Sequence, residues 1–176
     1  MEALDRLTME MMSHDCQDPK RIQHFLKVRA LCRLIGLGEG LSEAELFTLE
    51  TAALVHDIGI RVAETKYGRQ NGKLQEELGP PAARALLERL GFDPAVISRV
   101  CWLVSHHHTY AGFEDLDYRI LIEADWLVNN YEYGLDKREL YASCEHIFRT
   151  AAGKRLFSLM YGTPQQELGT EGTGTA

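Results

Sequence analysis

Five titratable side chains occupy positions where the helical periodicity of the sequence calls for an apolar residue: His24, His56, Asp57, His107 and Asp125. At about 100° per residue, each falls in line with aliphatic residues one or two turns away. Burying an unpaired carboxylate costs several kcal/mol, so the two aspartates need partners, and these helix faces carry no Arg or Lys. His24, His56, Asp57 and Asp125 would together form a mixed nitrogen and oxygen site for a divalent transition metal.

Each of these residues taken alone has a simpler structural explanation. A single core-facing histidine is more often a hydrogen-bonded structural residue than a ligand. An adjacent His-Asp pair arises often by chance, and one inward aspartate can cap a neighbouring helix. Four such residues on three helices of one short chain are harder to explain structurally, so we favour the metal site.

A basic segment follows the His56-Asp57 pair. Residues 58–74 carry a local charge of +3 in a chain of net charge −7, from Arg61, Lys66, Arg69 and Lys73 against the single acid Glu64. A glycine-containing connection next to a metal site is a candidate functional loop that attracts and orients a phosphate. We therefore expect Arg61, Lys66 and Lys73 to bind substrate, with Arg21 as a further contact. The alternative is a solvated loop with ordinary surface cations.

The elements that position these residues are all predicted to be helices. Asp18-Pro19, Ser42-x-x-Glu45 and Asp93-Pro94 are typical helix starts. We expect a single all-α domain over residues 1–162, a bundle of about seven helices with the metal site in its core, and a flexible tail over 163–176. The helices are predicted at residues 2–13, 19 to 36 or 38, 43–57, 74–90, 94–106, 117–133 and 137–160, with 58–73 as a polar connection.

Composition narrows the class of protein. The chain has 176 residues, of which 45% are hydrophobic, enough for one core without disulfides. With 26 acidic and 19 basic residues, a nucleic-acid polymer is not an expected partner. The four cysteines form no C-x-x-C pair, and we expect buried, reduced thiols. No apolar run suits a membrane span, and the acidic start is unlike a signal peptide. A cytoplasmic protein is expected, with a homodimer left open.

The order of these residues resembles the HD domain superfamily of metal-dependent phosphohydrolases, bacterial members in particular. The resemblance rests on Arg21-x-x-His24, the segment LVHDIG at 54–59, LVSHHH at 103–108 and Glu123-Ala124-Asp125, and it spans roughly residues 20 to 130. It implies an all-helical fold in which His24, His56, Asp57 and Asp125 bind a divalent metal ion. The identity of that ion stays open among Mn, Fe, Co, Ni and Mg.

Members of this superfamily with two metal ions carry further histidines between the HD pair and the last aspartate. Here no histidine occurs between Ile58 and Ser105. We therefore expect one tightly bound ion and at most one weak second site, for metal or phosphate, formed by Glu76 with His106 or His107. The alternatives are a solvated first helical turn at Gln75–Glu77 and an exposed helix end at 106–108.

The function that this resemblance implies is hydrolysis of a phosphoester in a nucleotide or another small phosphorylated metabolite. Asp57 and His107 are the expected catalytic residues, acting on water activated by the metal. Two alternatives stay open. One is an HD-fold di-iron oxygenase, which needs the second-site ligands, and the other is a non-catalytic module that senses a nucleotide.

Overall fold

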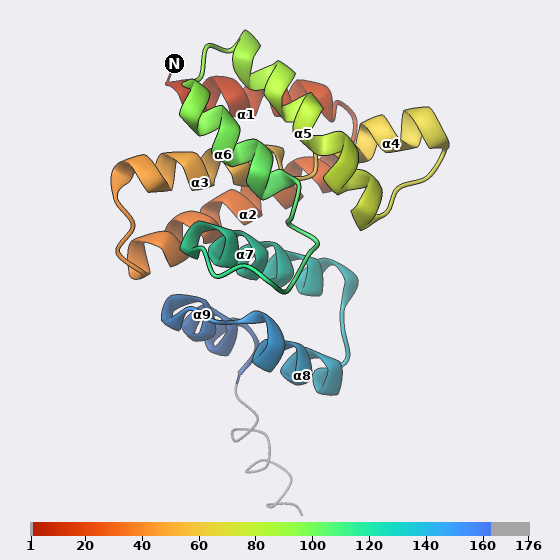
Figure 1. The fold of residues 1–176 in the computed structure, drawn as a ribbon. Helices are drawn as coiled ribbons and strands as arrows, with labels where there is room; N and C mark the ends of the chain where they lie inside the picture. The colour runs from red at the N-terminus through yellow and green to blue at the C-terminus, as the bar shows by residue number, and fades with distance from the viewer. Residues whose placement is uncertain (1, 163–176) are drawn as a thin grey trace, which may run out of the picture.

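The computed structural model describes residues 2–162, so the predicted tail at 163–176 lies outside the described residues. Within that range the chain is entirely helical, which confirms the predicted fold class (Figure 1). The helices are α1 (Ala3–His14), α2 (Pro19–Gly38), α3 (Glu43–Val55), α4 (Gly59–Tyr67), α5 (Gly72–Arg89), α6 (Pro94–Val104), α7 (Leu116–Tyr133), α8 (Lys137–Ile147) and α9 (Ala151–Tyr161).

The predicted helix starts are formed by the expected caps. The Asp18 side chain accepts a hydrogen bond from the Arg21 amide at the start of α2. Ser42 and Glu45 form a reciprocal capping box at α3, and Asp93 caps α6 ahead of Pro94. Each cap satisfies backbone N–H groups that have no partner within the helix. These short-range signals fix where the helices that carry the candidate ligands begin.

Two predicted segments differ from the structure, which has nine helices in residues 2–162 rather than about seven. The expected polar connection at 58–73 contains α4, which buries Ala63 and ends at Gly68 in the left-handed conformation, φ 64°. This helix has no side-chain cap, so its start gives no sequence signal. The predicted helix at 137–160 is divided at Phe148, whose extended backbone precedes the Thr150 cap of α9.

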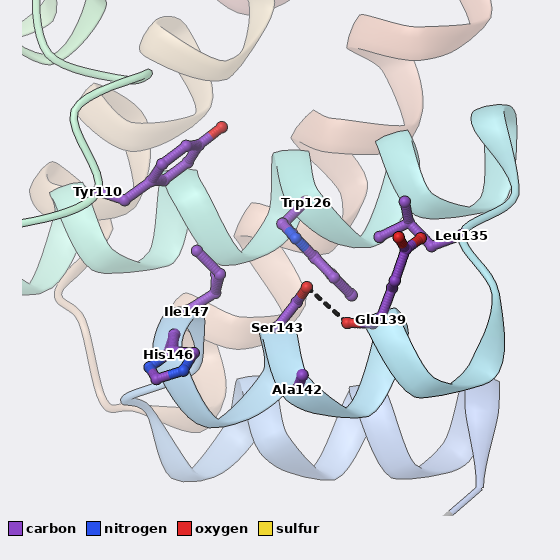
Figure 2. Close-up of a pocket in the computed structure, with 8 residues that line it drawn as sticks. All are labelled: Tyr110, Trp126, Leu135, Glu139, Ala142, Ser143, His146 and Ile147. Atoms are coloured by element: carbon purple, nitrogen blue, oxygen red, sulfur yellow. Dashed lines mark hydrogen bonds between the residues drawn. The ribbon is translucent and has the colours of Figure 1, made fainter.

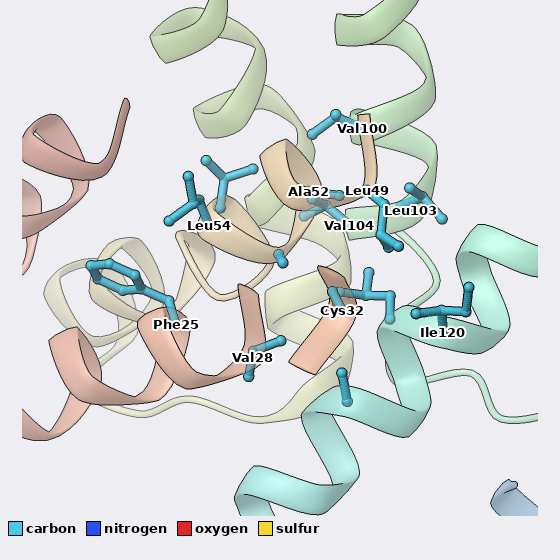
Figure 3. Close-up of a cluster of buried hydrophobic side chains, with 14 of the residues drawn as sticks. Phe25, Val28, Cys32, Leu49, Ala52, Leu54, Val100, Leu103, Val104 and Ile120 are labelled. Atoms are coloured by element: carbon cyan, nitrogen blue, oxygen red, sulfur yellow. The ribbon is translucent and has the colours of Figure 1, made fainter. Parts of the chain in front are cut away.

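Helix α2 is central to the packing. It lies against α3, α7 and α9, while α3 also contacts α6, and α5 packs between α4 and α6 (Figure 1). The faces that meet are aliphatic, with Val28 and Cys32 of α2, Leu49 of α3, Leu103 of α6 and Ile120 of α7 all buried (Figure 3). Helix α7 thus shares one core with α2 and α3, although it lies more than 60 residues after them in the sequence.

Burial was expected for all four cysteines, but only two of them are buried. Cys32 and Cys101 are buried free thiols, whereas Cys144 is partly exposed and Cys16 is exposed. Among the helices of residues 2–162, none combines the length and the apolar character required of a membrane span.

A close contact between glycines joins the segment after α3 to α5 and α6. A Cβ atom added at Gly59 would lie 2.9 Å from the Gly79 nitrogen and 3.0 Å from the Gln75 carbonyl oxygen. A Cβ atom at Gly79 would lie 2.6 Å from a methyl group of Val104. Because neither glycine has a side chain, the start of α4, the middle of α5 and the end of α6 meet at one place.

We expect Gly59→Ala to destabilise the protein by about 1–3 kcal/mol, because the added methyl group meets backbone atoms that cannot rotate away. Chemical denaturation of the variant and the wild type measures this difference. Lys66→Ala, at an exposed position of the same helix, is the control and should leave stability unchanged. A Gly59→Ala variant as stable as the control would contradict the packing described here.

Candidate metal centre

Four donor atoms from three parts of the fold meet in the core. His24 comes from the second turn of α2, His56 and Asp57 directly follow α3, and Asp125 lies in the middle of α7. His24 Nε2 is 3.2 Å from His56 Nε2 and 3.1 Å from Asp125 Oδ1. Asp57 Oδ2 lies 3.6 Å from His24 Nε2 and 3.5 Å from His56 Nε2. The structure thus brings together all four residues that the sequence singled out for the metal.

The tautomers of the two histidines direct lone pairs at each other. His56 Nδ1 is 2.8 Å from the Ala53 carbonyl oxygen, and His24 Nδ1 is 3.2 Å from Glu132 Oε2. Both oxygens accept hydrogen bonds, so each Nδ1 carries a proton, and Nε2 is the nitrogen of each ring that binds a metal ion once it is deprotonated. Two lone pairs held 3.2 Å apart repel each other unless a cation lies between them.

The donor set fits a divalent transition metal. Ligand atoms of a tetrahedral ion with bonds of about 2.1 Å lie about 3.4 Å apart. The donor atoms of His24, His56, Asp57 and Asp125 are separated by 3.1 to 3.6 Å in the pairs given above. His24, His56 and Asp57 form a group able to hold an ion, and Asp125, which lies beside that group, has its Oδ1 3.1 Å from His24 Nε2 and 3.5 Å from His56 Nε2. Two imidazoles and two carboxylates suit manganese, iron, cobalt, nickel or zinc better than calcium or magnesium, which prefer oxygen.

The charges in the site favour a cation. Burial lowers the pKa of His56, but Asp57 and Asp125 outweigh burial and raise that pKa to about 9. Burial raises the pKa of Asp57, whereas His56 and His107 lower it, and the net result is a pKa of about 2. Without metal, a proton on an imidazole therefore provides the positive charge that the two carboxylates require.

A second group of donors shares Asp57 with the first. Asp57, His107 and His108 form another set able to hold an ion. The two oxygens of the Asp57 carboxylate face different groups. Oδ2 faces His24 and His56, whereas Oδ1 lies 3.5 Å from His107 Nε2. His107 Nδ1 bonds to the Val104 carbonyl oxygen at 2.8 Å, and its buried Nε2 has no hydrogen-bond partner. Asp57 would therefore be a ligand common to both groups.

Comparison with known proteins agrees with this arrangement. The sequence model of the HD domain family matches residues 21–130, which is more than half of the chain. The chain belongs to the HD domain family. Its fold is similar to the crystal structure of a predicted HD superfamily hydrolase from an uncultured Thermotogales bacterium. That match has a TM-score of 0.61 and 24% sequence identity, and it covers 97% of this chain and 91% of the other. A search of curated proteins gave no significant match.

The second donor group of this HD domain includes a residue that the sequence analysis did not select. His108 Nε2 lies 2.7 Å from Gln75 Oε1. Burial lowers the pKa of His108 to about 4, and the neighbouring His107 lowers it further. His108 is therefore a neutral imidazole at pH 7, as a ligand must be. The only sequence signal was its place in the run His106-His107-His108. Because α6 ends at Val104, four residues earlier, helical periodicity does not extend to His108.

His106 and Glu76, expected near a second ion, serve other contacts. His106 stacks on Trp102 with ring centroids 4.6 Å apart, and its Nδ1 lies 2.8 Å from the Trp102 carbonyl oxygen. Glu76 Oε1 accepts hydrogen bonds from the His108 amide at 3.0 Å and from Thr109 Oγ1 at 2.9 Å. Glu76 thereby holds the loop that carries His108, and neither residue belongs to the two donor groups.

The cavity beside the first donor group has a volume of about 210 Å³. His24, Asp57, Lys20 and Arg21 are among its lining residues. Arg21 is held at its edge by Glu64, 2.5 Å away, and by Asp18 at 3.2 Å. Of the basic residues expected to bind substrate, Arg21 thus lines the cavity beside the first donor group.

The other three predicted cations are not brought to this cavity. Arg61 donates a hydrogen bond to the His14 carbonyl oxygen at 2.6 Å, and together with Lys66 it lines a separate surface depression. Lys73 is exposed in the first turn of α5. Arg61 and Lys66 lie on helix α4, which places them at that separate depression, whereas Lys73 belongs to α5.

A larger cavity, of about 540 Å³, lies between α7, α8 and the loop after α6 (Figure 2). Trp126, Leu135 and Ile147 contribute apolar side chains to its lining, and Figure 2 shows Trp126 extending from α7 toward α8. None of the candidate metal ligands lines it. Although Trp126 follows Asp125 in the sequence, successive residues of a helix lie about 100° apart, so the two side chains serve different faces of α7.

Asp57→Ala removes the carboxylate common to both donor groups, so we expect it to abolish tight metal binding while the fold survives. In the wild type, Mn²⁺ at about a hundred times its Kd should stabilise the protein by about 2.7 kcal/mol, which raises the Tm by about 5–10 °C. The variant should show little of this shift. Melting each protein with chelator and with Mn²⁺ separates metal-dependent from metal-independent effects. A lower Tm in both conditions, with the Mn²⁺ shift retained, would contradict the assignment.

Metal affinity should rise with pH. Because the pKa of His56 is about 9 without metal, its ring is protonated at pH 7, and metal binding must displace that proton. We expect the Kd for Mn²⁺ to fall about tenfold for each pH unit from pH 6 to 8, and to level off near pH 9. Calorimetric titration in two buffers of different ionisation enthalpy counts the protons released. A Kd that does not change over this range would show that His56 is not a ligand.

Proposed function

We propose that this HD domain is a metal-dependent phosphohydrolase acting on a nucleotide or another small phosphorylated metabolite. The observation that carries the proposal is the position of the donor group. His24 and Asp57 face a cavity that also presents the cationic side chains of Lys20 and Arg21. A metal-binding group next to fixed positive charge suits a phosphate ester, whose oxygens both can bind.

A divalent ion supplies two kinds of chemistry here, since it lowers the pKa of a bound water and polarises a phosphoryl oxygen. The protein's own groups orient the reactants. Asn129 donates a hydrogen bond of 2.9 Å to Asp125 Oδ1, which fixes that carboxylate. Arg21 can bind the phosphate by exchanging its bond to Glu64, which is partly exposed. These contacts hold the substrate phosphate against the donor group.

His107 has a different role in each metal-loading state. With one ion in the first donor group, the buried and unpaired His107 Nε2 can accept a proton from the attacking water. The same nitrogen would instead serve, with Asp57 and His108, as a ligand of a second ion where one is bound. We propose that the second ion binds more weakly, because only the first group has a further carboxylate, that of Asp125, beside it.

The volume of the cavity restricts the substrate. At about 210 Å³ it is smaller than the 300–1,000 Å³ typical of sites for drug-sized ligands. A phosphate and a few further atoms fill it, so the remainder of a nucleotide would lie at the rim. Tyr133 lines this cavity and is 69% exposed, with Lys20 Nζ 4.1 Å from its ring centre. Small phosphomonoesters are therefore favoured over bulky diesters.

The proposal is tested by loading metal-free protein with Mn²⁺, Co²⁺, Ni²⁺ or Fe²⁺ and measuring phosphate release from nucleotides, sugar phosphates and cyclic diesters. Hydrolysis of at least one phosphomonoester supports it. No hydrolysis with any metal would refute it, and tight nucleotide binding without turnover would favour the sensing module instead.

Arg21→Ala should raise KM for the best substrate about 10- to 100-fold, the loss expected for a hydrogen bond to a charged group. Metal content should stay unchanged, because within residues 2–162 the side chain of Arg21 pairs with Asp18 and Glu64 and not with a candidate metal ligand. The matched control is the double variant Arg61→Ala/Lys66→Ala, which lies outside the cavity and should keep wild-type kinetics. Steady-state kinetics and metal analysis of both variants decide the point. An effect in the control, with none in Arg21→Ala, would place the phosphate on α4 instead.

The second donor group keeps a di-iron oxygenase as the other candidate. Asp57, His107 and His108 supply ligands for a second iron that the sequence pattern alone did not. Iron-loaded protein exposed to air would then absorb visible light and consume oxygen with its substrate. Colourless protein that is fully active with manganese would eliminate this candidate.

A further inference from the structure

Three of the four histidines in the two donor groups, His24, His56 and His107, are held through Nδ1 in two different ways. His56 Nδ1 and His107 Nδ1 each lie 2.8 Å from a backbone carbonyl oxygen three residues earlier, that of Ala53 and that of Val104. These carbonyls belong to the last turns of α3 and α6, where backbone oxygens have no partner within the helix. A helix end thus fixes the tautomer of each of these rings without help from another side chain.

His24 has no such carbonyl available. It lies in the second turn of α2, which continues to Gly38, so nearby carbonyl oxygens accept hydrogen bonds from amides later in the helix. Its Nδ1 instead lies 3.2 Å from Glu132 Oε2, on α7 and 108 residues later in the chain. A side chain from another helix therefore performs for His24 what the backbone performs for His56 and His107.

Glu132 is itself held firmly. Its side chain is only 7% exposed, and its other oxygen, Oε1, accepts a hydrogen bond of 2.6 Å from Lys27 Nζ. Lys27 lies one turn after His24 on α2, with its Nζ 5.3 Å from the ring centre of Tyr131. The carboxylate is thus bound on both sides by α2, and its charge is balanced by Lys27.

We propose that Glu132 is a positioning residue of the metal centre, which holds the His24 ring by its Nδ1 proton and strengthens the binding of a divalent ion at Nε2. Lys27 pairs with the other oxygen of Glu132 and holds the side chain in place. This inference rests on the proposed function only in taking His24 as a metal ligand. A carboxylate that accepts the second N–H of a ligand histidine makes the ring more basic, and its removal typically weakens metal binding about 10- to 100-fold.

The test is the Mn²⁺ affinity of Glu132→Gln, measured by calorimetric titration of metal-free protein in the absence of substrate. Glutamine keeps the size of the side chain and removes its charge. We expect the Kd to be about 10- to 100-fold higher than in the wild type. A Kd within about twofold of the wild type would overturn the inference, because such an effect is below what a ligand-orienting contact supplies.

Glu50→Gln is the matched control for loss of a buried acid. The Glu50 side chain is 3% exposed and bonds to Arg29 Nε at 2.9 Å and Arg33 Nη1 at 2.7 Å, so it too pairs with cations of α2. It should lower the Tm while leaving the Kd for Mn²⁺ within about twofold of the wild type. An equal loss of affinity in both variants would assign the effect to stability and overturn the positioning role.

A second measurement reports on the ring itself. In Co²⁺-loaded protein, the Nδ1 proton of a ligand histidine gives a shifted proton resonance that exchanges with solvent. In Glu132→Ala the His24 resonance should broaden or disappear through exchange, while that of His56, bonded to a carbonyl, should persist. Retention of both resonances would overturn the inference.

These outcomes are separable from the fate of the proposed function. Wild-type protein that binds Mn²⁺ and hydrolyses nothing would refute the phosphohydrolase and leave the Glu132 comparison valid. Wild-type protein that binds no Mn²⁺ would overturn both.

Discussion

The structure depends on two carboxylates that are placed in a helical core without a basic side chain to neutralise them. Among residues 2–162, the ion pairs of Asp57 and Asp125 are formed with histidines alone. Desolvation of an isolated carboxylate costs far more than one hydrogen bond returns, so such a site requires a cation. Without metal, a proton on His56 supplies this positive charge, which is why the pKa of His56 is raised and that of Asp57 is lowered.

Other buried acids of the same domain show how different this arrangement is. Glu50 is neutralised by Arg29 and Arg33, and Glu132 is paired with Lys27. Glu123 of α7 accepts hydrogen bonds from the backbone amides of Arg149 and Thr150, and so secures the start of α9. Each of these acids has a dedicated partner that explains its burial. Asp57 and Asp125 have histidine rings whose lone pairs also need a cation, which is why a metal site accounts for them better than a structural role.

The C-terminal ends of two helices orient candidate metal ligands. Unpaired carbonyls in the last turns of α3 and α6 set the tautomers of His56 and His107, and the glycine contact at Gly59 and Gly79 brings those two helix ends together. The two donor groups can share Asp57 because the chain immediately after α3 lies against α5 and the end of α6. Asp57, the residue common to both groups, also lines the cavity that contains Arg21.

Local signals in the sequence determined the helical class, most helix boundaries and four inward-facing residues. Capping residues and periodicity act within a few residues, so Asp18, Ser42 and Asp93 could be identified from their neighbours alone. The same periodicity placed His24, His56, Asp57 and Asp125 on core faces. It could not place the basic segment, because the uncapped helix α4 gives no start signal and places Arg61 and Lys66 at a separate surface depression.

Tertiary structure alone decided which residues surround these four candidate metal ligands. His108 and His106 have the same type and nearly the same position in the sequence, yet one faces Asp57 and the other stacks on Trp102. Their directions are set by a loop that Glu76 holds from α5, beyond the end of the α6 periodicity. Glu132 meets His24 across 108 residues of chain. Periodicity gives the face of a helix on which a residue lies, whereas its partner depends on how the helices pack, and that is fixed by long-range contacts.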